Sequence, residues 1–412
     1  MNKKLLFIAL ILSCTVHSRA QEVKVDAEIR SRAEYRDGFQ QPLLDTEDAA
    51  YVNNLRTKLN LSYKGEDIKA KLTLYDNRTY GKTAIGSTGG SLGVLEAWGE
   101  YAFTPQLSFT LGRQGLEYDD KRLFSYNNWS NTQSAHDLLL LKYAGAGLTV
   151  HVGSAYNNEK DGNSWVPYPT SLTYKTLNFI RAEKAFGKIS ASALWVNDGF
   201  EGEDTEKANR FYRNTVGAYL WLSDKKSPTT FTLNGYYQFG KDKSDKELNA
   251  YLLSAKAQQQ LSRLWALQIG GDLFSGSDKN IESGKNNTFN KLYGTNHAFN
   301  GSIEYWRNLP VQGLVDLYAG ATFKRSRLSV NLTYHNFSTQ KEFQTGEGKN
   351  IGSEVDITVD YTVNSRLAIQ GGWSAYIAST GTEILKKQTG VDTRFPQWAY
   401  VQLTFKPVFF NK

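Results

Sequence analysis

Residues 23–36 (VKVDAEIRSRAEYR) alternate between apolar or small side chains and charged ones along their whole length. Because successive side chains of a β-strand point to opposite faces, this segment predicts a strand with one apolar and one charged face. The same alternation recurs along nearly the whole chain, and few segments have the pattern of a helix that could cover the apolar faces. Lipid can cover them instead. The pattern therefore predicts a membrane-embedded β-barrel.

The beginning of the chain has the pattern of an export signal. Two lysines precede a short apolar run, and a small-x-small cleavage site (SRA) follows it. We therefore predict that residues 1–20 are a secretory signal peptide and that residues 21–412, beginning at Gln21, form one barrel domain. The alternative is a lipoprotein site with acylated Cys14.

Composition excludes several classes of function. Cys14 is the only cysteine, so a chain that begins at Gln21 contains neither disulfides nor catalytic thiols. The formal net charge of +7 is modest and includes basic residues of the signal, so no nucleic acid is expected as a partner. A negative mean hydropathy fits a barrel with a polar, water-filled interior.

The alternating segments outline the strands. Outside the signal, no apolar run approaches the roughly 20 residues of a membrane helix, so any span has to be a strand. Single-chain barrels have an even number of strands, so one member of this odd-numbered set is spurious or split, and we predict an all-β, transmembrane antiparallel β-barrel of about 18 strands. The predicted strands are 23–36, 51–64, 67–80, 92–103, 107–114, 136–144, 147–156, 172–186, 188–198, 212–223, 229–239, 248–261, 264–274, 298–306, 314–324, 327–338, 351–363, 366–377 and 397–409.

Connections and aromatic residues fit the same architecture. Short turns alternate with long polar loops, as at the two rims of an outer-membrane barrel. The long loop at 115–135 mixes aromatic and polar residues, and we predict that it folds into the barrel. Aromatic residues near strand ends are expected to form two interfacial girdles. These are Tyr35, Trp98, Tyr101, Phe103, Trp195, Trp221, Trp306, Trp373 and Trp398.

Two segments carry family-like motifs. In 107–137 these are Gly112-Arg113-Gln114, Tyr118-Asp119-Asp120 followed by Arg122, then Trp129 and Asp137. In 288–301 they are Phe289, Leu292, Tyr293, Asn296, His297 and Gly301. Through these residues the chain resembles the alginate-export family of outer-membrane barrels. The resemblance implies a barrel of about 18 strands, with an arginine-rich constriction that passes a carboxylate-bearing polysaccharide such as an alginate-like polyuronate.

Basic residues on the polar faces of the first strands are expected to line the lumen. They are Arg30, Arg32, Arg56, Lys58, Lys69 and Lys71, and the family motif adds Arg113 and Arg122. Arginine matches the planar geometry of a carboxylate, and rings of basic side chains select anions in pores. The alternative is that these cations pair with carboxylates on neighbouring strands and leave a nonselective wall.

Acidic residues of the motif have two interpretations. Asp119, Asp120 and Asp137 either hold Arg113 and Arg122 in place or bind a cation. We expect pairing and no metal site, because calcium needs about six to eight oxygen ligands.

The sequence also predicts no catalysis. The histidines lack zinc-site spacing, and His297 is expected to pack within a loop. There is no recognisable nucleophile arrangement and no Gly-rich phosphate loop, so neither an enzyme nor a cofactor is expected.

These features together predict a channel in the outer membrane of a Gram-negative bacterium. It would pass anionic, carbohydrate-like solutes through a basic constriction. The alternatives are a nonselective porin or nutrient importer, and a plugged barrel that acts as a surface adhesin. The expected partners are outer-membrane lipid and lipopolysaccharide, an anionic polysaccharide or oligosaccharide, and a periplasmic export partner.

Overall fold

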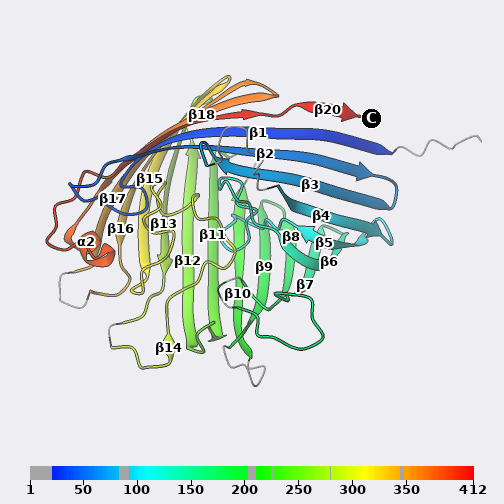
Figure 1. Ribbon diagram of the computed structural model, residues 1–412, viewed down its shortest axis with the longest axis horizontal. Helices are drawn as coiled ribbons and strands as arrows, with labels where there is room; N and C mark the ends of the chain where they lie inside the picture. Colours follow the sequence, from blue (N-terminus) through cyan, green and yellow to red (C-terminus); the bar gives the residue numbers. More distant parts are fainter. Residues whose placement is uncertain are drawn as a thin grey trace, which may run out of the picture.

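The computed structural model describes residues 21–82, 92–169, 171, 173–202, 210–223, 227–278, 280–343 and 348–412. The signal peptide predicted for residues 1–20, including Cys14, lies outside them. The described residues form one closed ring of strands, and the strand nearest the N-terminus lies beside the last one (Figure 1).

The barrel consists of 18 antiparallel strands. They are β1 (Glu22–Asp37), β2 (Ala50–Lys64), β3 (Ile68–Thr79), β4 (Gly93–Ala102), β5 (Leu107–Gln114), β6 (His136–Gly145), β7 (Leu148–Tyr156), β8 (Thr176–Phe186), β9 (Ile189–Glu201), β10 (Arg210–Ser223), β11 (Thr229–Lys241), β12 (Glu247–Gln260), β13 (Trp265–Phe274), β15 (Leu314–Arg325), β16 (Leu328–Ser338), β17 (Asn350–Asn364), β18 (Leu367–Ile377) and β19 (Gln397–Phe405). Each pairs with the next, and β19 pairs with β1. The predicted strand count is therefore confirmed.

Two further elements do not add strands to the ring. β14 (Lys285–Asn286) is a short segment within a loop and pairs with β12. β20 (Val408–Asn411) continues the last strand along β1. Since the two ends of the chain meet along β1, no open sheet edge remains in the described wall.

The alternation in β1 sorts its side chains as predicted. Val23 and Ile29 are each 39% exposed on the outer face, whereas Glu28, Arg30 and Glu34 are buried on the inner face. Apolar side chains that would be costly in water are thus available to lipid, and the charged ones line the interior. The sequence pattern and the observed faces of this strand agree.

The predicted strand at 298–306 is wrong, because this segment is a loop inside the barrel. Gly301 and Glu304 have left-handed backbone conformations, with φ of 85° and 63°, which interrupt an extended strand. Ile303 and Trp306 are almost completely buried. Their apolar side chains pack in the interior rather than against lipid. The sequence of this loop therefore has the same apolar pattern as a strand of the wall.

The aromatic girdle is only partly as predicted. Trp195, Trp221 and Trp373 are exposed on strands of the wall, where lipid headgroups can solvate their ring edges. Trp306 and Trp398, by contrast, are 2% and 1% exposed and belong to the interior core. Position near a strand end does not distinguish the two faces of a barrel.

Tight turns occupy one rim of the barrel. The turn between β6 and β7 uses Ala146 and Gly147, both left-handed, with φ of 51° and 73°. Two consecutive left-handed residues match the twist of a hairpin, and glycine adopts this conformation without steric cost. The first and last described residues lie at this rim, where the backbone of Val23 donates a hydrogen bond to Lys412 (2.8 Å). Short turns identify it as the periplasmic rim.

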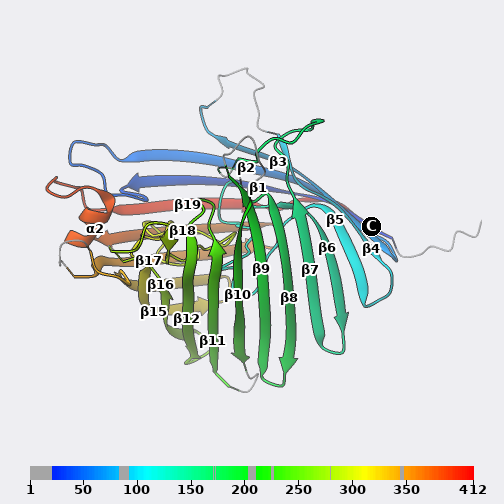
Figure 2. The same cartoon turned by 90° about the horizontal axis from the view of Figure 1, so that it is seen from below.

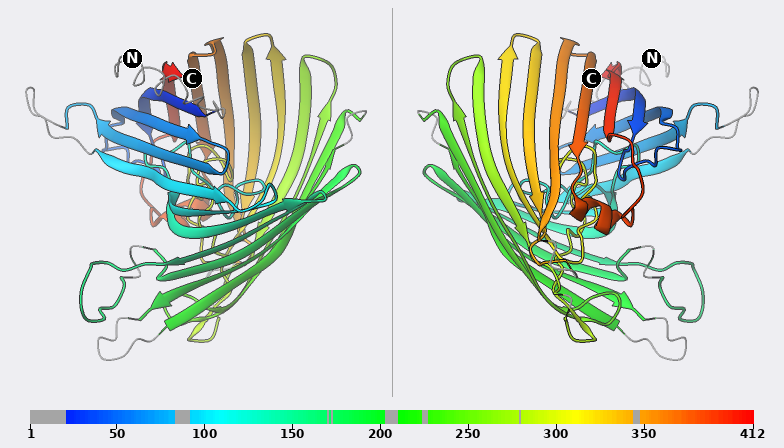
Figure 3. Two further views of the ribbon diagram at one scale, coloured as in Figure 1. Left: turned by 90° about the vertical axis from the view of Figure 1, so that its right-hand side faces the viewer. Right: turned by 90° about the vertical axis from the view of Figure 1, so that its left-hand side faces the viewer.

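Long loops occupy the opposite rim (Figures 2 and 3). The loop after β18 contains the short helix α2 (Thr380–Lys386). Among the described residues, no helix is long and apolar enough to cross a membrane.

Two loops turn inward and supply the interior core. The loop at 115–135 buries Leu123 and Phe124, and the loop at 275–313 buries Ile303. Figures 1 and 3 show these segments inside the ring of strands. The prediction that 115–135 folds into the barrel is therefore confirmed.

Candidate functional site

The two motif segments, far apart in sequence, are joined inside the barrel. Phe124 and Tyr293 form a parallel β-bridge. The backbone of Tyr293 donates to Leu123 (2.9 Å), and Ser125 donates back to Tyr293 (3.0 Å). The inward loops therefore form one hydrogen-bonded unit across the lumen.

A glycine permits this close approach. A Cβ atom at Gly294 would lie 1.9 Å from the carbonyl oxygen of Arg122, closer than any side chain can come. The two loops meet backbone to backbone at this point, as glycines in crowded positions allow.

Aromatic stacking joins the loops a second time. The rings of Trp129 and His297 stack at 3.9 Å with planes 8° apart. Trp129 also packs edge-on against Trp398 and Tyr400 of β19. His297 therefore packs between loops, and its Nδ1 lies 3.2 Å from Glu304.

Arg122 is an internal anchor of the loop. Its guanidinium donates to both oxygens of Asp272 on β13 (2.8 Å each) and to Asp120 (2.8 Å), and Phe299 covers it at 3.9 Å. Burial lowers the pKa of the Arg122 guanidinium, but the carboxylates of Asp272 and Asp120 outweigh burial and hold that pKa above its usual value. Arg122 is thus neutralised and structural.

Asp119 and Tyr118 fix the neighbouring part of the loop. Asp119 accepts hydrogen bonds from Arg181 on β8 (2.7 Å) and Ser192 on β9 (2.7 Å). The Tyr118 hydroxyl lies 2.9 Å from Nδ1 of His151 on β7. The carboxylates of the motif therefore pair with arginines, although Asp119 selects Arg181 rather than Arg113 or Arg122.

Arg113 differs from the other arginines of the motif. It pairs with Asp137 on the adjacent strand at 2.7 Å, and the two side chains are 42% and 59% exposed. The neighbouring Gln114 is buried and donates to backbone oxygens. Arg113 is accordingly part of an exposed cross-strand pair and does not come together with Arg122.

The arginines of β1 and β2 form the buried basic surface of the lumen. Arg30 and Arg56 lie directly opposite one another in the register of these strands. Arg56 pairs with Glu28 and Arg32 with Glu34. Among the described residues, Arg30 has no carboxylate within ion-pair distance.

The lysines of this surface are compensated by carboxylates on neighbouring strands. Lys58 pairs with Glu28 (3.3 Å), and Lys69 pairs with Glu100 (2.6 Å). Lys71 pairs with Glu96 on β4 (2.5 Å). For these positions the structure has the cross-strand pairing that the alternative interpretation expects.

Sequence reasoning missed the acidic residues that receive the loops. Asp198 on β9 accepts from the Tyr293 hydroxyl (2.8 Å) and pairs with Arg213 on β10. Glu354 on β17 is fully buried and accepts from the backbone of Ile303 (2.7 Å). Each lies on a polar strand face, but no local signal reveals which loop it receives.

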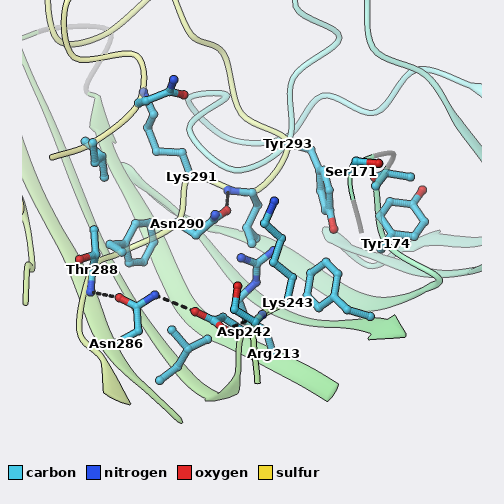
Figure 4. Close-up of a pocket in the computed structure, with 18 of the residues that line it drawn as sticks. Ser171, Tyr174, Arg213, Asp242, Lys243, Asn286, Thr288, Asn290, Lys291 and Tyr293 are labelled. Carbon is cyan, nitrogen blue, oxygen red and sulfur yellow. Dashed lines mark hydrogen bonds between the residues drawn. The ribbon is translucent and has the colours of Figure 1, made fainter. Parts of the chain in front are cut away.

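A divided vestibule lies on the long-loop side of this unit. Three hollows of about 540, 190 and 560 Å³ all have Asn296 in their walls. Lys291 and Arg307 line the hollow of about 540 Å³. Figure 4 shows Lys291 and Asn290 in this cavity, with Arg213, Asp242 and Lys243 on the other side. Asn296, a residue of the second motif, therefore lies where the three hollows meet.

Two cations of the vestibule lack a carboxylate partner among the described residues. The buried Nζ atom of Lys291 has no hydrogen-bond partner, and Arg307 is exposed and forms no ion pair with a described residue. Burial, together with the charges of Arg122 and Arg307, lowers the pKa of Lys291 to about 8. Lys291 is therefore a cation without a hydrogen bond or an ion pair among the described residues, and it titrates near neutral pH.

In the part of the chain that the structure describes, no group of three or more His, Cys, Asp or Glu side chains could hold a metal ion. Interior carboxylates such as those of Asp119, Asp198 and Asp272 instead pair with arginines.

A closed barrel with an apolar outer belt and a polar interior crossed by two loops is an outer-membrane channel protein of a Gram-negative bacterium. The chain belongs to the alginate export family, whose profile matches residues 21–378. This membership points to a transport channel rather than an enzyme. No curated protein matches the chain significantly in sequence.

Solved structures with the same fold include three porin-type proteins. OccAB4 of Acinetobacter baumannii superposes with a TM-score of 0.66 at 10% identity, covering 95% of this chain and 99% of that one. The outer membrane protein opdK of Pseudomonas aeruginosa gives 0.63 at 12% identity, covering 94% and 99%. OprD of Pseudomonas aeruginosa gives 0.61 at 12% identity, covering 94% and 96%. At these identities the likeness shows the fold alone.

Proposed function

We propose that this channel passes anionic, carbohydrate-like solutes, with a uronate-bearing chain as the best-fitting class. The observation that carries the proposal is the set of cations without carboxylate partners among the described residues: Arg30 within the barrel, and Lys291 and Arg307 in the vestibule. A low-dielectric wall focuses their field on a passing anion. Family membership supports the same class of solute.

The interior geometry favours a slender solute. The joined loops divide the vestibule into hollows of about 190 to 560 Å³. A solute that threads past Asn296 therefore meets amide side chains for hydrogen bonding and nearby cations for its carboxylates. This arrangement suits a single extended chain better than a bulky branched one.

Ion selectivity tests the proposal directly. In planar bilayers under a salt gradient, we expect a reversal potential whose sign indicates that anions permeate better than cations. Replacement of both Lys291 and Arg307 by glutamine should shift it towards zero, because two uncompensated charges leave the vestibule. Replacement of Lys69, which pairs with Glu100, is the matched control and should shift it less. A cation-selective wild type would contradict the proposal, and selectivity near unity would favour the nonselective porin.

Anion preference should also depend on pH. The pKa of Lys291 is lowered to about 8, so its positive charge is present below that pH and is lost above it. Raising the pH from about 7 to about 9 should therefore reduce the anion preference of the wild type. The Lys291→Gln variant should have a lower preference at the acidic end and a flatter profile across this range. An identical pH profile in both proteins would show that Lys291 does not face the conducting path.

A further inference from the structure

The tip of the inward loop, residues 127–133 (NNWSNTQ), contains no charged side chain, although 22% of the chain is charged. This neutral tip lies against the buried guanidinium groups of Arg30, Arg32 and Arg56. Arg30 and Arg56 are direct neighbours across the β1–β2 pair, an arrangement in which like charges repel. The tip therefore covers a basic surface without neutralising it.

Backbone oxygens of the tip bridge these two arginines. The carbonyl oxygen of Asn128 accepts from Arg30 (2.7 Å) and from Arg56 (2.8 Å). The carbonyl oxygen of Ser130 likewise accepts from Arg30 (2.9 Å) and Arg56 (2.8 Å). Two oxygens shared between two guanidinium groups resemble the contacts that a carboxylate makes with arginine forks. Neutral groups of the tip therefore fill a position whose hydrogen-bond donors suit an anion.

The tip has further contacts with the wall and a closed base. The Tyr75 hydroxyl donates to the Asn131 carbonyl (2.6 Å), and Lys58 donates to Gln133 (3.1 Å). Arg32 donates to the Trp129 carbonyl (3.0 Å) and lies 4.2 Å above the Trp129 ring. At the base of the tip, Ser134 donates to Tyr126 (3.2 Å), which closes the segment on itself. Below that base, Arg122 and its carboxylates anchor the loop. The tip can therefore leave the arginines while the root of the loop stays in place.

Space for a competing ligand already lies beside the tip. The hollow of about 190 Å³ has Arg32, Trp129 and Ser130 in its wall and opens to Asn296. A carboxylate that enters this hollow meets Arg32, whose guanidinium shares the Trp129 carbonyl with Arg30.

We propose that the tip is a displaceable latch: a carboxylate-bearing solute takes the arginine donors from the carbonyl oxygens of residues 128–130 and so opens its own path. This inference rests on the proposed function, because it requires an anionic solute. A carboxylate brings a full negative charge to Arg30, whereas a carbonyl brings only a dipole. Vestibule water solvates the released carbonyl groups. Hydrogen bonds with water therefore partly replace those that the carbonyl oxygens lose with the arginines. Stacking of Trp129 on His297 favours closure after the solute leaves.

Accessibility of a single thiol measures displacement of the latch. Because Cys14 lies in the predicted signal peptide, a mature Ser130→Cys variant carries one cysteine. An uncharged maleimide reagent reports its exposure in purified channels. Trigalacturonate should raise the labelling rate about threefold or more, because the ligand shifts the latch towards its open state. Maltotriose, a neutral sugar of the same length, should leave the rate unchanged.

Second variants separate the latch from general loosening of the protein. Adding Arg30→Gln to Ser130→Cys should give fast labelling that no longer responds to trigalacturonate. Arg30→Lys keeps the positive charge but removes the planar guanidinium group. Ser130→Cys with Arg30→Lys should therefore be labelled faster than Ser130→Cys alone, and the test does not depend on the folding of a single variant. Arg78→Gln removes a cation that pairs with Asp76 and should behave like the parent. A Thr389→Cys variant in an exposed loop controls for reagent access.

The outcomes distinguish this inference from the proposed function. An unchanged labelling rate at trigalacturonate concentrations that interrupt single-channel current would overturn the latch and leave the anion channel in place. Equal acceleration by maltotriose would also overturn it, because displacement would not depend on carboxylates. If trigalacturonate neither interrupts the current nor changes labelling, the latch and the uronate proposal both fail.

Discussion

Replacing Arg122 by glutamine is expected to release the root of the inward loop from the barrel wall. The substitution leaves the buried Asp272 and the partly buried Asp120 without their cation. Breaking a buried ion pair by removing one partner costs about 3–5 kcal/mol. We therefore expect trypsin cleavage after the adjacent Lys121 to accelerate by about a hundredfold or more, since local opening governs such cleavage.

Arg113 provides the matched control for this prediction. The two arginines belong to one sequence motif, but Arg113 pairs with Asp137 at an exposed position. An exposed ion pair contributes about 0–1 kcal/mol, so Arg113→Gln should change the cleavage rate at Lys121 by no more than about fivefold. Similar rates in both variants would mean that Arg122 does not anchor the loop.

Deleting the loop tip is expected to enlarge the conducting path. Ser134 and Tyr126 are hydrogen-bonded at 3.2 Å, so residues 127–133 can be replaced by two glycines without spreading the base. The deletion removes the neutral segment that covers Arg30 and Arg56, and single-channel conductance should rise about twofold or more. Anion preference should rise with it, because the arginines then face water directly.

The control for the deletion retains the backbone of the tip. Alanine at Asn128 and Asn131 removes their side-chain contacts with Arg56 and Arg30 and keeps the carbonyl oxygens in place. This double variant should conduct nearly as the wild type does. If conductance is unchanged by the deletion and binding of an acidic polysaccharide to whole cells is lost, the loop serves as an external binding element and the adhesin alternative gains.

Local sequence patterns were sufficient to predict the strands that form the wall of the barrel. The alternation in 23–36 predicted both the strand β1 and its inner and outer faces, because the period of a strand is a property of neighbouring residues. The aromatic content of 115–135 likewise predicted an inward loop. The same local rule failed at 298–306, where Ile303 and Trp306 are apolar because they pack in the interior.

The candidate site could be predicted only as a set of residues. The two motifs contained Arg122, Trp129, Tyr293 and His297, but nothing in the sequence joined Trp129 to His297 or separated Arg113 from Arg122. Lys291, with its unpartnered Nζ, was missed because its burial depends on how the second loop folds.

The sequence by itself determined a membrane barrel with a charged inner face on its first strands, since strand periodicity and side-chain chemistry are local. The tertiary structure alone decided which charges are compensated. Arg122 and Asp272 are 150 residues apart and meet only because the loop crosses the lumen. Pairing across a barrel depends on ring closure and loop paths, which bring together residues that no local pattern relates.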